Sequence, residues 1–96
     1  MYVRFLTFKA NPRRRSELEA LGDQVFKYVK SLKGFISVHF IISENANEYG
    51  SFSLWESRAD AISAGQSIRA KIGGTLQNLA SGSPKTEIYE VYKPGI

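Results

Sequence analysis

The sequence contains no cysteine, which excludes a disulfide framework, a thiolate metal site and a cysteine nucleophile. It contains a single histidine, and the carboxylates show no ligand-like clustering, so no metal site is expected. No apolar run approaches the roughly 20 residues that a membrane helix needs. The first residues are strand-like and lack the layout of a signal peptide. We therefore expect a cytoplasmic protein without a membrane segment.

Basic residues exceed acidic ones, which gives a formal net charge of +4. Three arginines are adjacent at 13–15, and three lysines follow on the same predicted helix. Such an excess can reflect binding of nucleic acid or of another anion. The aromatic residues alternate with aliphatic ones and are not interleaved with these basic residues, as a base-stacking surface requires. The pattern favours a solvated helix face over a nucleic-acid partner.

The 96 residues, 43% of them hydrophobic, predict one globular domain that spans residues 1–96. Alternating β-forming residues predict four strands, at 2–9, 35–43, 49–55 and 86–92. With a helix after the first strand and another after the third, the order is βαββαβ. This order predicts a ferredoxin-like α+β fold, with a four-stranded antiparallel sheet and both helices on one face.

Capping residues mark the two helices. Asn11-Pro12 predicts the start of a helix over 12–32, and Ser57 predicts the start of a helix over 58–72. Gly34 is expected in a left-handed conformation after the first helix. Gly73-Gly74 is expected to end the second helix, with a short helical turn after it.

The two faces of the predicted hairpin differ in polarity. If Ser43 pairs with Tyr49, one face carries Ile36, Val38, Phe40, Ile42, Gly50, Phe52 and Leu54. The other face carries Ser37, His39, Ile41, Ser51, Ser53 and Trp55. A slip of one residue would exchange these sets. The helices can cover only one face, and the other would expose a large apolar patch, so the sequence predicts a homodimer in which sheet packs on sheet.

Three segments carry a family resemblance: Lys33-Gly34-Phe35, Trp55-Glu56-Ser57 with Ala59 and Ala61, and Glu87-Ile88-Tyr89-Glu90-Val91. With the element order, they resemble the antibiotic biosynthesis monooxygenase family, whose members form dimeric α/β barrels. The family includes cofactor-free oxygenases that act on polycyclic phenols, haem-degrading enzymes and many members of unknown role.

The resemblance implies a pocket between the sheet and the helices, into which the family's Trp points. It assigns Trp55, Ser53, Ser51 and His39 to this pocket, with Ser37 beside them, and gives the all-apolar face to the dimer. The residues alone would instead place the all-apolar face under the helices. The small residues Ala61, Ala64 and Gly65 are consistent with a helix that approaches the Trp face closely or leaves space over it.

The chain departs from both catalytic sets of the family. Gly65 stands where haem-degrading members carry the histidine that binds iron, so no haem is expected. Ser51 and Ala61 stand near the asparagine and the tyrosine of the polyketide-oxidising members. No cofactor is therefore expected, and only Trp55 remains of either set.

Two functions stay open at this point. In the first, the chain resembles a cofactor-independent monooxygenase of aromatic or polyketide-like compounds, with His39 as the base, Trp55 as a wall, and Ser51 and Ser53 orienting a substrate oxygen. In the second, the chain is a non-enzymatic dimeric module that binds a ligand or a partner. For each of these residues, packing in the core or along a strand is the alternative role.

Overall fold

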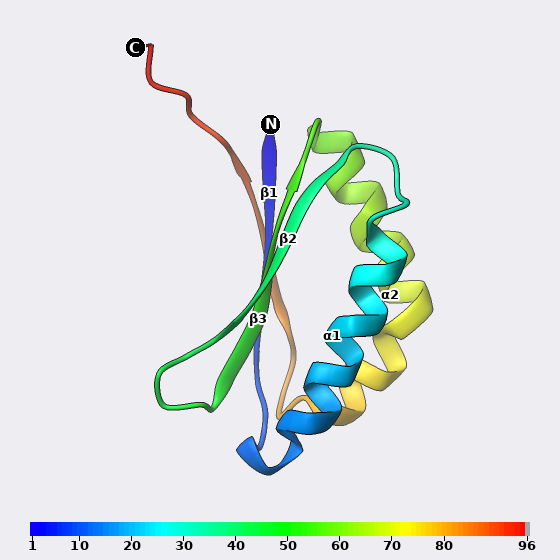
Figure 1. Ribbon diagram of the computed structural model, residues 1–96, viewed down its shortest axis with the longest axis vertical. Helices are drawn as coiled ribbons and strands as arrows, with labels where there is room; N and C mark the ends of the chain where they lie inside the picture. Colours follow the sequence, from blue (N-terminus) through cyan, green and yellow to red (C-terminus); the bar gives the residue numbers. More distant parts are fainter. Residues whose placement is uncertain (96) are drawn as a thin grey trace.

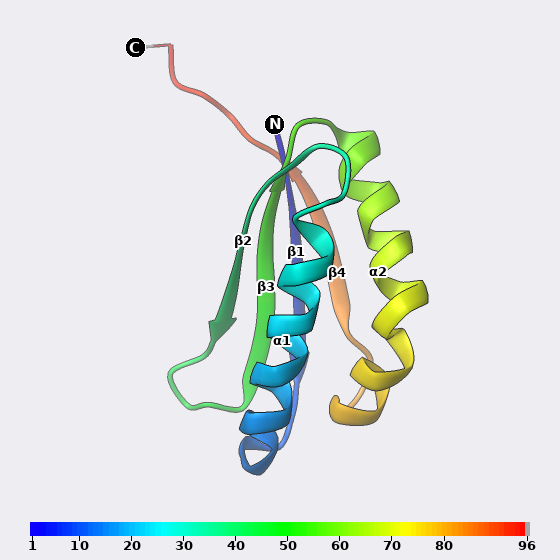
Figure 2. The ribbon, with the colours of Figure 1, turned by 45° about the vertical axis from the view of Figure 1, so that its right-hand side comes forward.

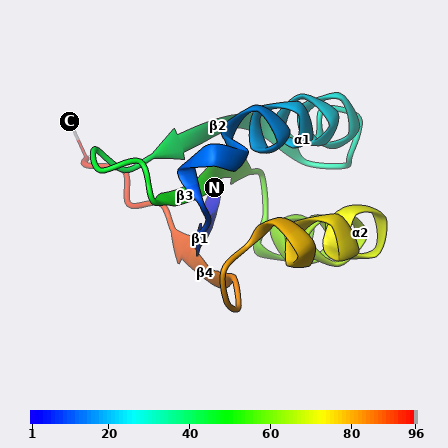
Figure 3. The same cartoon turned by 90° about the horizontal axis from the view of Figure 1, so that it is seen from below.

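The computed structural model describes residues 1–95, which form one antiparallel sheet and two helices. The strands are β1 (Tyr2–Lys9), β2 (Phe35–Ile42), β3 (Glu48–Trp55) and β4 (Lys85–Glu90), in the order β2-β3-β1-β4. The helices α1 (Arg15–Val29) and α2 (Arg58–Leu79) cover the same face of this sheet (Figures 1 and 3). A 3-10 turn, η1 (Pro12–Arg14), precedes α1. The ferredoxin-like α+β prediction is confirmed.

The first helix is shorter than the sequence suggests. The Asn11 side chain accepts a hydrogen bond from the backbone N–H of Arg13 at 3.0 Å, as a cap should, but the first turn is 3-10. The carbonyl of Tyr28 accepts hydrogen bonds from both the backbone N–H and the hydroxyl of Ser31, which ends α1 in a tight turn. Gly34 follows at φ +81°, the left-handed conformation expected of it.

The second helix continues past the point where the sequence predicts its end. Ser57 caps it by accepting a hydrogen bond from the backbone N–H of Asp60 at 3.1 Å, but Gly73-Gly74 do not break it. A glycine in a helix interior costs about 1 kcal/mol relative to alanine. Beyond the glycines, Leu79 is 5% exposed and Leu76 packs on the same core, so burial of these side chains offsets the cost.

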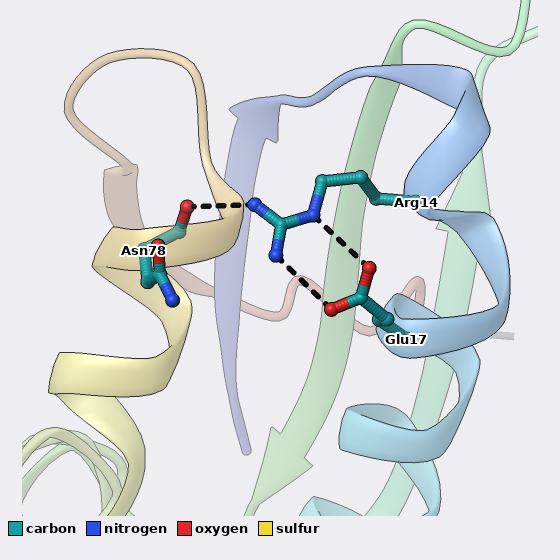
Figure 4. A network of polar contacts seen from close by, with 3 residues as sticks. All are labelled: Arg14, Glu17 and Asn78. Atoms are coloured by element: carbon teal, nitrogen blue, oxygen red, sulfur yellow. Dashed lines mark hydrogen bonds and ion pairs between the residues drawn. The ribbon is translucent and has the colours of Figure 1, made fainter.

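Arg14 joins the start of one helix to the end of the other (Figure 4). Its guanidinium donates to the carbonyl of Asn78 at 3.2 Å and to both carboxylate oxygens of Glu17. The hydrogen bond from Arg14 lowers the pKa of the Glu17 carboxyl. Arg15 pairs with Glu19 through a single hydrogen bond, from its Nε to one carboxylate oxygen at 3.1 Å. Two of the three adjacent arginines therefore form ion pairs on the surface, which fits a solvated helix face.

The register of the β2–β3 hairpin differs by one residue from the prediction. Ile42, and not Ser43, pairs with Tyr49, so the segment between the two paired residues is 43–48, one residue longer than the expected 44–48. Ala46 adopts φ +59°, and its N–H donates to the Ser43 carbonyl at 2.9 Å. The Ser43 hydroxyl also accepts a hydrogen bond from the backbone N–H of Glu48 at 3.1 Å, which closes the turn.

This register exchanges the two predicted faces of β2 but not those of β3. The face under the helices, called the helix face, carries Arg4, Leu6, Val38, Phe40, Ser51, Ser53 and Trp55. The opposite face, called the open face, carries Val3, Phe5, Ser37, His39, Ile41, Phe52, Leu54 and Tyr89. The prediction that His39 shares a face with Trp55 is therefore wrong.

The core between the sheet and the helices consists of two clusters. The Trp55 cluster comprises Val29, Trp55, Ala61, Ala64 and Ile68. The Tyr49 cluster comprises Ala10, Leu18, Leu21, Tyr49 and Leu79. Both α1 and α2 contribute to each cluster. Tyr49 lies near the start of β3 and Trp55 at its end, so the clusters lie toward opposite ends of the strands, along which both helices run (Figure 2). Within residues 1–95, neither helix combines the length and hydrophobicity that crossing a membrane requires.

Candidate functional site

A cavity of about 440 Å³ lies between the helix face and the two helices, at the end occupied by the Tyr49 cluster. Its walls are mainly apolar, and the sheet and both helices contribute side chains to them. These include Leu6, Phe8, Leu21, Phe40, Ile72 and Leu76. On α1, Gly22 faces the ring of Phe40, where an added Cβ would meet ring carbons at 3.7 Å. The cavity thus has the size and the lining of a site for a small apolar molecule.

Few polar groups reach this cavity. The Ser51 side chain is buried in its floor, and the Tyr49 hydroxyl is engaged by donating to the Ala46 carbonyl at 3.1 Å. Two carboxylates from α1, Glu19 and Asp23, complete the lining, and Glu19 is paired with Arg15. A hydroxyl in the floor and a carboxylate at the helix wall could orient one polar edge of a bound molecule.

Trp55 does not line this cavity. The indole is 0% exposed, and its N–H donates to the Ser53 hydroxyl at 2.9 Å. The ring of Phe35 packs edge to face on it, with centroids 5.7 Å apart, and Ala61 and Ala64 of α2 belong to the same buried cluster. Trp55 and Ser53 therefore form a filled, fully hydrogen-bonded part of the core.

His39 lies on the open face, away from both the cavity and Trp55. It pairs with Phe52 of β3, and the two rings are 6.3 Å apart. Ser37 lies on the same face and pairs with Leu54. The predicted pocket that unites His39 with Trp55 is thus not formed, because the one-residue difference in register turns β2 over.

Five described residues were proposed for the site from the sequence: Ser37, His39, Ser51, Ser53 and Trp55. Of these five, only Ser51 lines the cavity. The sequence reading missed Phe40, Tyr49 and Asp23. The clearest signal that could have found the site is Gly22, a glycine inside the apolar stripe of a helix, where a side chain is missing from the packing. Within residues 1–95, no three His, Asp or Glu side chains are grouped closely enough to hold a metal ion.

No family model matches the sequence, and no curated protein matches it either. Solved structures do match in fold. A monooxygenase from the gene ActVA-Orf6 of Streptomyces coelicolor, in complex with nanaomycin D, is 20% identical with a TM-score of 0.82, over 99% of this chain and 90% of that one. SnoaB, a cofactor-independent oxygenase from Streptomyces nogalater, is 15% identical with a TM-score of 0.77, over 98% and 96% of the two chains.

A putative antibiotic biosynthesis monooxygenase from Nitrosomonas europaea is 13% identical, with a TM-score of 0.84, over 97% of this chain and 91% of that one. At these identities the likeness establishes the fold. The chain therefore has the fold of the antibiotic biosynthesis monooxygenases, as its resemblance to that family implied.

Proposed function

We propose that the chain binds a flat, largely apolar aromatic compound in the cavity beside Tyr49 and oxidises it with O2 without a cofactor. The observation that carries the proposal is the cavity itself, which has mainly apolar walls and the buried hydroxyl of Ser51 in its floor. Structures of the same fold include a cofactor-independent oxygenase and a monooxygenase with a bound ligand, which supports this choice of reaction.

The reaction requires a substrate that loses a proton readily, such as an anthrone-like compound. A base removes a proton from carbon, and the resulting carbanion reacts with O2. One oxygen atom stays on that carbon as a carbonyl, and the other leaves as water. Asp23 is the candidate base, because it lines the cavity while His39 does not, and because Glu19 is held by Arg15. The apolar walls limit the contact of the carbanion with water.

The test is O2 uptake with an anthrone-like substrate. Gly22→Leu should fill the cavity and abolish uptake, while Gly22→Ala, whose methyl only touches Phe40, should retain it. Asp23→Asn should lower kcat by about 10²-fold or more, the usual contribution of a general base. His39→Ala should leave the rate unchanged. Uptake that survives Gly22→Leu but is lost in His39→Ala would overturn the assignment of this cavity.

Binding without turnover is the second candidate function. It is favoured by the closed packing around Trp55, which leaves that residue no contact with a molecule in the cavity. In this case the same aromatic compound should bind to the wild type and fail to bind to Gly22→Leu, with no O2 consumed by either protein.

We also propose that two chains pair through their open faces. This face presents Phe5, Phe52 and Leu54 with the exposed side chains of Ile41 and Tyr89, more apolar surface than a monomer usually exposes on one face. Light scattering should give twice the 10.8 kDa chain mass, and Phe52→Glu should return it to one chain. A wild-type particle of one chain mass at micromolar concentration would contradict the pairing.

A further inference from the structure

Arg4 is a buried cation in the middle of the sheet. It lies on the helix face of β1, between Ser53 of β3 and Ile88 of β4, and is 6% exposed. Within residues 1–95, its guanidinium has no hydrogen bond and no ion pair with another residue. Burial lowers the pKa of the Arg4 guanidinium, and the positive charge of Arg69 lowers it further. A buried charge normally has a partner of opposite charge.

A glycine of α2 makes room for this side chain. A Cβ added to Gly65 would lie 2.8 Å from Nε of Arg4 and 3.5 Å from its Cζ. The helix therefore passes directly over the guanidinium, and any larger residue would displace it.

The guanidinium opens into a second cavity, of about 640 Å³, between α2 and the start of β4. Within residues 1–95, every side-chain nitrogen or oxygen that is closed to solvent has a hydrogen-bond partner. The guanidinium of Arg4 has none, so its nitrogens are open to solvent, and the cavity that Arg4 lines provides that space. Arg69 lines the same cavity, together with the polar side chains of Gln77, Ser83 and Thr86. Among the described residues that line this cavity there is no Asp or Glu, so none of them neutralises the two arginines.

The remaining lining is apolar and separates this space from the cavity beside Tyr49. Leu6, Ile72 and Leu76 line both cavities, and Ala80 and Pro84 line only the second. A ligand of the second cavity therefore needs an anionic group that binds the arginines and an apolar body that packs against the apolar walls. An arginine binds a carboxylate through two parallel hydrogen bonds, and the interaction strengthens away from water.

We propose that Arg4 and Arg69 bind the carboxylate of a small organic acid in the second cavity. Arg4 provides a fixed guanidinium on the sheet, Arg69 a second cation on the helix, and the apolar walls hold the body of the acid. The site is separate from the proposed oxygenase cavity and does not depend on that function.

Calorimetric titration with benzoate, benzamide and inorganic phosphate tests the site. Benzoate should bind, and benzamide, which has nearly the same shape without the charge, should bind at least tenfold more weakly. Arg69→Gln should weaken benzoate binding about tenfold, because it removes one of the two cations that contact the carboxylate. Arg69 is exposed, so the variant should still fold. Arg58→Gln removes the same charge from the same helix outside the cavity and should leave binding unchanged.

Arg4→Met retains much of the side-chain volume and removes the charge. It should abolish benzoate binding and, without any ligand, raise the melting temperature, because an unpaired buried cation is gone. Gly22→Leu, which fills the other cavity, should not alter benzoate binding. Equal binding of benzoate and benzamide, unchanged binding in Arg69→Gln, or loss of binding in Gly22→Leu would overturn the proposal. Binding of phosphate alone, with none of benzoate, would overturn the choice of an organic acid.

Discussion

The two ends of the space between the sheet and the helices differ in how completely they are filled. At one end, Trp55 is 0% exposed and is closed in by Ala61 and Ala64 of α2. At the other end, the Tyr49 cluster leaves a cavity of about 440 Å³, and Phe40 at its edge is 45% exposed. The same two layers enclose both ends, so the difference comes from the residues between them.

Large and small residues are matched at the closed end and mismatched at the hollow end. The indole of Trp55 stands opposite two alanines, which let α2 come close enough to bury it. At the hollow end, Gly22 of α1 stands opposite Phe40, and no further side chain fills the space beside the ring. The residue that looks most like a site residue is therefore part of the core, and the site lies where the packing is incomplete.

The largest expected effect comes from emptying the closed end. Trp55→Ala removes a fully buried indole and should lower the free energy of unfolding by about 4 kcal/mol, within the range for such substitutions in cores. Urea unfolding followed by far-ultraviolet circular dichroism measures it. Phe40→Ala at the hollow end is the matched control and should cost less than half as much. Equal costs would mean that the two ends are equally packed.

The indole hydrogen bond gives the next largest effect. Ser53→Ala removes the acceptor of the Trp55 N–H and leaves that donor buried without a partner, which should cost about 2 kcal/mol. Ser51→Ala is its control two residues earlier on the same strand, and we expect a change within about 0.5 kcal/mol, because the Ser51 side chain faces the cavity. A larger loss in Ser51→Ala than in Ser53→Ala would contradict the assignment of Ser53 to the core.

Much of the fold could be predicted from local patterns, because alternation and caps act over a few residues. Ser57 and Gly34 have the conformations that their residue types favour. The register could not be predicted, because it depends on Ala46 at φ +59°, a conformation that alanine seldom adopts. The continuation of α2 through Gly73-Gly74 depends on the burial of Leu79, a tertiary effect.

The candidate site was less predictable than the fold. A cavity is the space that packed side chains leave over, and it depends on distances between layers that the order of residues does not specify. His39 was paired with Trp55 only through the wrong register, and Ser51 is the one proposed residue that lines the cavity beside Tyr49. Arg4 carried no signal, since one charge in a strand is normally solvent-exposed.

A smaller effect is expected where α2 crosses Arg4. Gly65→Ala gains about 1 kcal/mol of helix propensity, but its Cβ would lie 2.8 Å from Nε of Arg4. Displacing a buried guanidinium beneath a helix should cost about 2 kcal/mol, as overpacking does elsewhere, so we expect a net loss of about 1 kcal/mol. In the Arg4→Met background the same substitution should be closer to neutral, because a flexible thioether can move aside. A net gain in the wild-type background would contradict the close approach.

The smallest expected effect has the opposite sign and lies at the hollow end. Gly22→Ala makes the same change on α1, where the new methyl would only touch the Phe40 ring at 3.7 Å. The helix propensity is then gained without a steric penalty, and the free energy of unfolding should rise by about 0.8 kcal/mol. Gly74→Ala adds a Cβ that would meet no atom within 4 Å beyond its own helix backbone and chain neighbours, so it measures the propensity alone and should give a similar gain. If Gly22→Ala destabilises while Gly74→Ala stabilises, then α1 lies closer to the sheet than Phe40 allows, and the cavity beside Tyr49 is smaller than described.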